Sequence, residues 1–121
     1  MSSEAITRQP VVWIVNKGGH DYGPADVYGR TVPITTDSIN PFNLDRMMVL
    51  IKARIVHADP NDFVLISGSP ILNGVVLAMW LERFGKVNIL QYSKRKFKYE
   101  RLLLTKEAVI ANATSPIQPA G

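Results

Sequence analysis

The chain contains no cysteine and only two histidines among its 121 residues. Without cysteine the protein has neither a disulfide scaffold nor a thiolate-ligated metal site, and a reducing compartment suits it. Because histidines are few and the carboxylates are scattered, we expect no bound metal and no cofactor. The composition therefore excludes the disulfide-rich and zinc-finger classes, and we expect a cytoplasmic protein.

Long apolar runs and leader-like segments are also missing. The longest strongly apolar stretch, residues 75–81, is far too short to cross a bilayer. Residues 1–4 do not begin the basic and apolar regions that mark a secretion signal. We therefore expect neither secretion nor a membrane partner.

The sequence fingerprints of four common enzyme classes are absent. There is no GxGxxG dinucleotide-binding motif, no P-loop, no GxSxG nucleophile elbow and no HExxH helix. These absences leave function to be argued from the arrangement of individual residues.

The composition that is present is ordinary for a globular protein, with 46% apolar residues and a mean hydropathy of +0.04. The length fits one domain. We expect a flexible lead over residues 1–9, a single α/β domain over residues 10–113 and a flexible tail over residues 114–121.

Apolar patterning predicts the order of the elements. The β-branched run at residues 11–15 is typical of a central strand buried on both faces. Further strands are expected at residues 31–35, 63–66, 87–92 and 97–104. Helical spacing predicts one helix that begins at Asn40-Pro41 and another over residues 71–84. A short helix is expected near residues 106–113.

This order predicts a three-layer, Rossmann-like α/β sandwich. Its sheet should have four or five strands, mainly parallel, with an antiparallel hairpin at one edge. Two helices can hardly cover both faces of such a sheet, so a terminal helix or a second subunit should supply the missing cover. We therefore expect a homo-oligomer, with the apolar helix 71–84 or an edge strand at its interface.

Two turns at strand ends are candidate anion sites, because glycine lets backbone amides approach a ligand and helix N-termini favour negative charge. The first turn offers Lys17, Gly18 and Gly19, and the second offers Ser67, Gly68 and Ser69. The alternative interpretations are a solvent-facing strand exit for the first turn and an ordinary capped helix start for the second.

Few residues of the sequence are candidates for catalysis. If the protein is an enzyme, His20 with Asp21 or Asp37 is the acid–base group, since histidine titrates near neutral pH. Ser67 or Ser69 would then be the nucleophile. Because no enzyme motif supports these residues, we expect a binding protein rather than an enzyme.

The whole net charge of +4 lies in one hairpin, which carries five basic residues and one acidic residue within residues 94–101. Cations there can neutralise phosphates, and aromatic rings among them can stack on bases. The candidate nucleic-acid-binding residues are Lys94, Arg95, Lys96, Lys98, Tyr99 and Arg101. The alternative is an edge hairpin whose lysines prevent aggregation while its aromatics pack inward.

From these features we expect a non-enzymatic binding module for phosphate-bearing ligands, most of all nucleic acid, that acts through the basic hairpin. One alternative is a small hydrolase or nucleotide-processing enzyme with its site at the carboxyl ends of the strands. Another is a protein–protein adaptor or an inhibitor of a partner enzyme.

Overall fold

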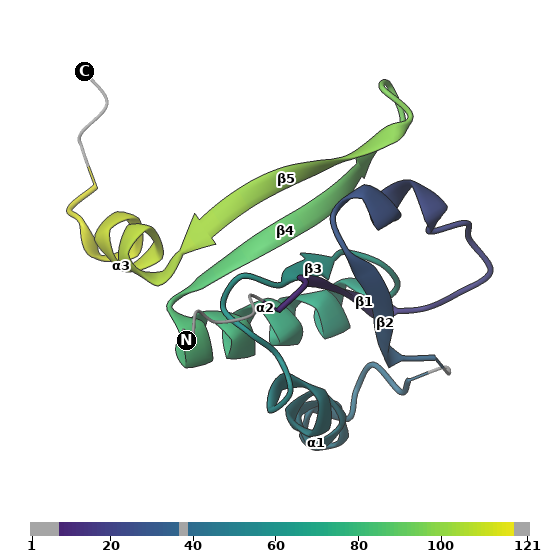
Figure 1. Ribbon diagram of the computed structural model, residues 1–121. Coiled ribbons are helices and arrows are strands. Elements are labelled where there is room, and N and C mark those ends of the chain that lie inside the picture. Colours follow the sequence, from purple (N-terminus) through teal and green to yellow (C-terminus); the bar gives the residue numbers. More distant parts are fainter. Residues whose placement is uncertain (1–7, 37–38, 118–121) are drawn as a thin grey trace, which may run out of the picture.

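The computed structural model describes residues 8–36 and 39–117 (Figure 1). Strands and helices follow one another as β1 (Val11–Asn16), the 3-10 helix η1 (Gly23–Val27), β2 (Arg30–Thr35), α1 (Leu44–Ile55), β3 (Phe63–Leu65), α2 (Pro70–Phe84), β4 (Lys86–Ser93), β5 (Lys98–Thr105) and α3 (Lys106–Thr114). No helix among these residues is both long enough and apolar enough to span a bilayer.

The five strands form one mixed sheet in the order β2-β1-β3-β4-β5. β1 pairs in parallel with both β2 and β3, β3 pairs in parallel with β4, and β4 pairs antiparallel with β5. The predicted α/β class, the mainly parallel sheet and the antiparallel edge hairpin are confirmed. The position of β1 inside the sheet agrees with the uninterrupted apolar run at residues 11–15.

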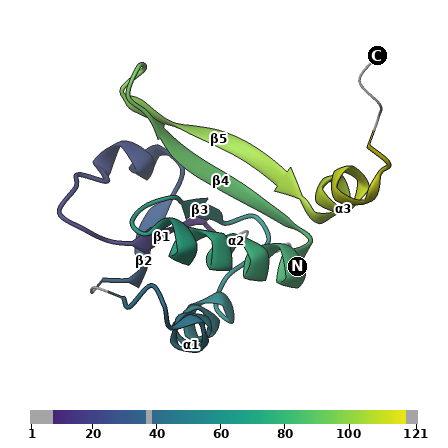
Figure 2. The ribbon, with the colours of Figure 1, turned by 180° about the vertical axis from the view of Figure 1, so that it is seen from behind.

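The expected three-layer, Rossmann-like sandwich is not confirmed. α1 and α2 share one face of the sheet, and the other face carries only η1 and its flanking loops (Figures 1 and 2). The connection from β1 to β2 steps in one direction across the sheet, whereas the next two connections step in the other. Because such crossovers are right-handed, opposite steps place their crossing segments on opposite faces.

The core is divided by the sheet. On the helix side, Val11, Trp13 and Val15 of β1 pack with α1 and α2. On the other side, Val12 and Ile14 pack with the η1 region. α2 is apolar nearly all round because it contacts both the sheet and α1, so most of its apolar surface is at least partly covered.

The helix boundaries correct one expectation and confirm another. α1 does not begin at Asn40-Pro41, because Asn43 is its N-cap and accepts a hydrogen bond from the Arg46 N–H over 3.0 Å. Asn40 instead closes a turn by accepting from the Phe42 N–H. The expected end of α2 is confirmed, since Gly85 follows it with a left-handed φ of 76°.

Candidate nucleic-acid interface

Three adjacent pockets lie where the parallel strands end. We call them the β2–α1 pocket (about 340 Å³), the central pocket (about 240 Å³) and the hairpin pocket (about 490 Å³). Thr36 lines both of the first two, and His20, Tyr22 and Gly68 line both of the last two. The three pockets therefore form one trough, which we call the carboxyl-edge groove.

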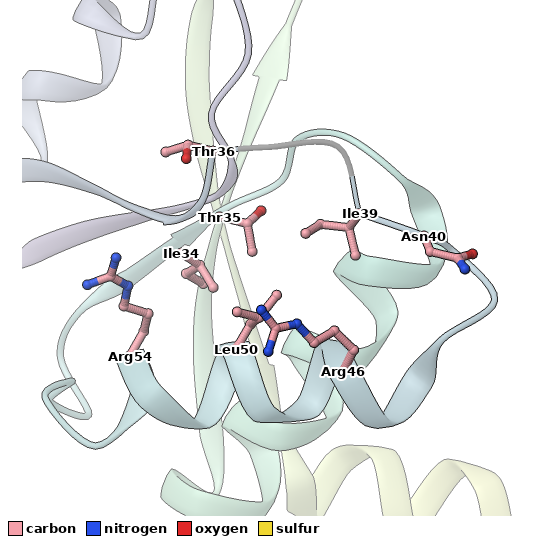
Figure 3. A pocket seen from close by; sticks show the side chains of 8 residues that line it. All are labelled: Ile34, Thr35, Thr36, Ile39, Asn40, Arg46, Leu50 and Arg54. Atoms are coloured by element: carbon pink, nitrogen blue, oxygen red, sulfur yellow. The ribbon is translucent and has the colours of Figure 1, made fainter.

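Cationic side chains line the carboxyl-edge groove along its length. Arg46 and Arg54 of α1 line the β2–α1 pocket, where Arg46 folds back over Leu50 and Arg54 projects from the other end of the helix (Figure 3). Lys17 follows in the central pocket and Lys94 in the hairpin pocket. Within the described part of the chain, none of these four takes part in an ion pair. Asp21 is the only carboxylate among the described residues that line the groove.

Ser67 is committed to the fold rather than to a ligand. Its hydroxyl donates to the Asn16 carbonyl over 3.0 Å and accepts from the Asn16 N–H over 3.1 Å. Its own N–H donates to Asn73 Oδ1 over 3.1 Å, and Asn73 Nδ2 donates back to the Ser67 carbonyl. Both donors of Ser67 are therefore used within the protein.

Gly68 and Ser69 follow Ser67 in the same turn. Gly68 has a φ of +81°, and a Cβ built on it would lie 2.8 Å from the Asn16 Cβ. The glycine therefore allows this turn to pack closely against β1. Ser69 is the N-cap residue of α2, yet its side chain makes no capping hydrogen bond. Ser69 lines none of the three pockets in the described part of the chain.

In the turn formed by Lys17, Gly18 and Gly19, hydrogen bonds within the protein use two of the backbone N–H groups but leave the Lys17 side chain available to a ligand. The Lys17 N–H donates to the Thr35 carbonyl over 2.8 Å, and the Gly18 N–H donates to the Tyr22 hydroxyl over 3.0 Å. A Cβ on Gly19 would meet open space. This turn therefore offers the Lys17 ammonium to an anion rather than a cradle of backbone amides.

The candidate acid–base residues are only partly brought together. His20, Asp21 and Ser67 line the hairpin pocket, and Asp37 lies outside the described residues. Asp21 Oδ1 accepts from the Gly23 N–H, and no hydrogen bond joins His20 to Asp21 or Ser67 in the structure as described. In the described ranges, no three His, Asp or Glu side chains gather where they could hold a metal ion.

The hairpin tip exposes both charge and an aromatic ring. Lys94, Arg95 and Lys96 are exposed, and Phe97 is 78% exposed at a left-handed φ of 54°. Lys96 pairs with Glu100 over 2.9 Å, which raises the pKa of Lys96 and lowers the pKa of Glu100. Lys94 and Arg95 are therefore the less engaged cations.

The strand residues that follow the tip are more enclosed than the tip itself. Tyr99 is only 6% exposed, and its ring meets Tyr92 edge-on with centroids 5.2 Å apart. Burial raises the pKa of the Tyr99 hydroxyl. Arg101 Nε donates to Asn88 Oδ1 over 3.2 Å, whereas Lys98 is exposed. Phe97 and Tyr92, which is 41% exposed, are thus better placed than Tyr99 to meet a ligand.

Sequence reasoning missed several residues of the groove. Tyr22, Tyr92 and Arg54 line it although they were not among the candidate site residues. Asn73, which holds the turn after β3, could have been noticed as the one polar side chain in the first 12 residues of α2. Its 7% exposure is typical of a polar side chain with a fixed structural task.

The fold and groove define a small α/β protein with a mostly parallel five-stranded sheet and a cation-lined trough at its carboxyl edge. Residues 10–105 match the family described as phage Pam3 gp32-like protein, and the chain belongs to that family. The matched segment runs from the residue before β1 to the last residue of β5. No curated protein and no solved structure matches the chain.

Proposed function

We propose that this protein is a non-enzymatic binding module for phosphate-bearing ligands and that its ligand is single-stranded nucleic acid. The observation that carries the proposal is the continuity of the carboxyl-edge groove with the basic hairpin. Tyr92 and Lys94 of the hairpin line the same pocket as His20 and Gly68 of the strand-end turns. A chain of phosphates can therefore follow one surface from the hairpin to α1.

The electrostatics of the groove suit a linear polyanion. From β4 to β2 the groove crosses three strand intervals, which is about 14 Å at the usual strand spacing. Lys94, Lys17 and Arg46 are spread along this path. Such spacing matches successive phosphates better than it matches one compact anion, since contacts to several phosphates add up through counterion release.

The aromatic side chains favour a single strand over a duplex. Phe97 is exposed at the hairpin tip, and Tyr92 is partly exposed at the mouth of the hairpin pocket. An unpaired base presents its flat face to such rings, whereas a base within a duplex is already stacked. The few side chains involved support binding without sequence readout.

The enzyme alternative receives less support from the same geometry. The Ser67 hydroxyl donates its proton to the Asn16 carbonyl instead of to a general base. A serine nucleophile is normally hydrogen-bonded to the base that activates it, and His20 makes no such bond in the described structure. Binding rather than catalysis is therefore the function we propose.

The test is fluorescence anisotropy with a labelled single-stranded oligonucleotide at low salt. Lys94→Glu with Arg95→Glu should abolish binding, because both exposed cations become repulsive. The matched control is Lys52→Glu with Arg83→Glu, which makes the same charge change on α1 and α2, away from the groove. The control should bind nearly as well as the parent.

The salt dependence of the affinity reports how many phosphates the hairpin cations neutralise. For single strands, each neutralised phosphate contributes about 0.7 to the slope of log affinity against log salt. Lys94→Ala with Arg95→Ala should therefore make the slope shallower by about 1.4. A parent that gives no anisotropy change at low salt, or a control that loses as much affinity as the hairpin variant, contradicts the proposal.

A further inference from the structure

Among the described residues no strand pairs with the outer edge of β5, and the Tyr28 hydroxyl donates to the Tyr99 carbonyl near the hairpin end of that strand. β5 is the last strand of the sheet, it has eight residues, and α3 continues past its end without covering its edge (Figures 1 and 2). The opposite edge strand, β2, carries Pro33, which lacks an N–H donor and discourages pairing. β5 has no proline, so its edge can accept another strand.

The carboxyl half of β5 is apolar on both faces. Its register with β4 places Leu102 and Leu104 opposite Ile89 and Val87, on the face covered by α1 and α2, and Leu103 on the other face. Leu102 is 51% exposed and Leu103 is 55% exposed. An isolated edge strand normally carries charge at such positions to prevent pairing.

α3, the helix that follows β5, also leaves apolar side chains exposed. None of the residues of α3 is buried, and Ile110 is 51% exposed. A nine-residue helix is too short to be stable without tertiary contacts. Its contacts with β5 and the ion pair between Lys106 and Glu82 hold its start, while its apolar side chains remain uncovered.

We propose that a second copy of this chain pairs its β5 with this edge in antiparallel orientation, around a twofold axis perpendicular to the sheet. The two five-stranded sheets then join into one continuous sheet. We place the axis at Leu103. In this register Leu103 faces its own symmetry mate, and Leu102 faces Leu104 of the second copy. The apolar half of each strand is thereby covered by the apolar half of the other.

Apolar matching and charge select this register over its neighbours. Within β5 it sets each leucine of the run against a leucine and places no like charges opposite each other. A shift that centres the axis on Leu102 would set Leu103 against Arg101 and Leu104 against Glu100. A shift that centres it on Arg101 would set two arginines face to face. Directly opposed like charges destabilise a strand pair. The sequence of β5 is thus complementary to itself in one register, which favours a second copy over an unrelated partner.

The first test is the mass of the parent protein in solution by light scattering and sedimentation. We expect twice the chain mass of 13.5 kDa at micromolar concentration. Leu103→Lys, which opposes two ammonium groups across the axis, should raise the dimer dissociation constant by at least about tenfold. The matched control is Val49→Lys on the exposed side of α1, where Val49 is 59% exposed, and it should remain dimeric.

A second test fixes the register and does not depend on the folding of a charged variant. The parent has no cysteine, so a single introduced cysteine reports only on its own symmetry mate. Leu103→Cys should form a covalent dimer under mild oxidation, because directly opposite Cβ atoms lie about 4.5–5.5 Å apart. Leu102→Cys should cross-link far less, since its symmetry mate is diagonal at about 7–8 Å.

Two results would overturn the proposal. One is a parent that stays monomeric at about 100 µM, a concentration well above the dissociation constants of stable dimers. The other is a parent dimer that Leu103→Lys leaves intact or that cross-links through Leu102→Cys instead of Leu103→Cys.

Discussion

The indole Nε1 of Trp13 in β1 donates a hydrogen bond to Oδ2 of Asp62, the residue before β3, over 3.0 Å. The Asp62 side chain is fully buried and also accepts from the N–H groups of Val11 and Asp59 and from the Arg8 guanidinium. Burial by itself would raise the pKa of Asp62, but these hydrogen bonds outweigh it and hold that pKa below its ordinary value. Asp62 therefore joins the start of β1 to the loop before β3.

Replacing this carboxylate should destabilise the fold. Asp62→Asn removes the charge that pairs with Arg8 and turns an amide donor toward groups that are themselves donors. We expect the free energy of unfolding to fall by about 2–4 kcal/mol, because buried donors lose their acceptor. Urea unfolding measures the loss. The control is Asp26→Asn on the exposed surface of η1, which should change stability by less than about 0.5 kcal/mol.

The same carboxylate should shape the acid limb of the stability curve. Because the folded pKa of Asp62 lies below the unfolded value of about 3.9, the folded state binds fewer protons than the unfolded state in that range. The stability from Asp62 is thus present above about pH 4 and lost as the pH falls through the lower folded pKa. Unfolding curves measured from pH 7 down to pH 2 should show the gap between parent and Asp62→Asn narrowing below about pH 4. A gap that stays constant across this range contradicts the assignment.

Gly68 and Gly19 should respond differently to the same change. Gly68→Ala forces a side chain onto a φ of +81° and sets its Cβ 2.8 Å from the Asn16 Cβ. We expect a loss of about 1–3 kcal/mol, which thermal unfolding detects. Gly19→Ala meets nothing within 4 Å and should be nearly neutral in stability. Equal losses for the two variants would mean that the turn after β3 has relaxed away from β1.

Much of the fold follows from local sequence. The apolar run of β1 predicts an interior strand, Pro33 is consistent with an edge strand, and Gly85 marks the end of α2. Each signal depends on the conformational limits or the burial of a few neighbouring residues. Such limits act within one segment, so they can be read without knowing the rest of the structure. The start of α1 was misplaced because Asn40 and Asn43 are both good capping residues, and only one of them meets a free helical N–H.

The site depended on information that no single segment carries. Period-two alternation assigns Tyr99 to a face of β5, but the loop before η1 and the hydroxyl contact of Tyr28 enclose that position. The hydroxyl of Ser67 is used by β1, which lies 51 residues earlier in the chain. Both outcomes follow from strand order, which the sequence leaves open because a strand can join either side of β1.

The sequence alone therefore determined the five strands, the three α-helices apart from the start of α1, the mainly parallel pairing and the concentration of charge in the hairpin. The tertiary structure decided that α1 and α2 share a face, that three pockets join into the carboxyl-edge groove, and that the apolar edge of β5 is left open. The division has one physical cause. Secondary structure reflects interactions between near neighbours, whereas layers, grooves and open edges depend on the direction in which each crossover steps across the sheet.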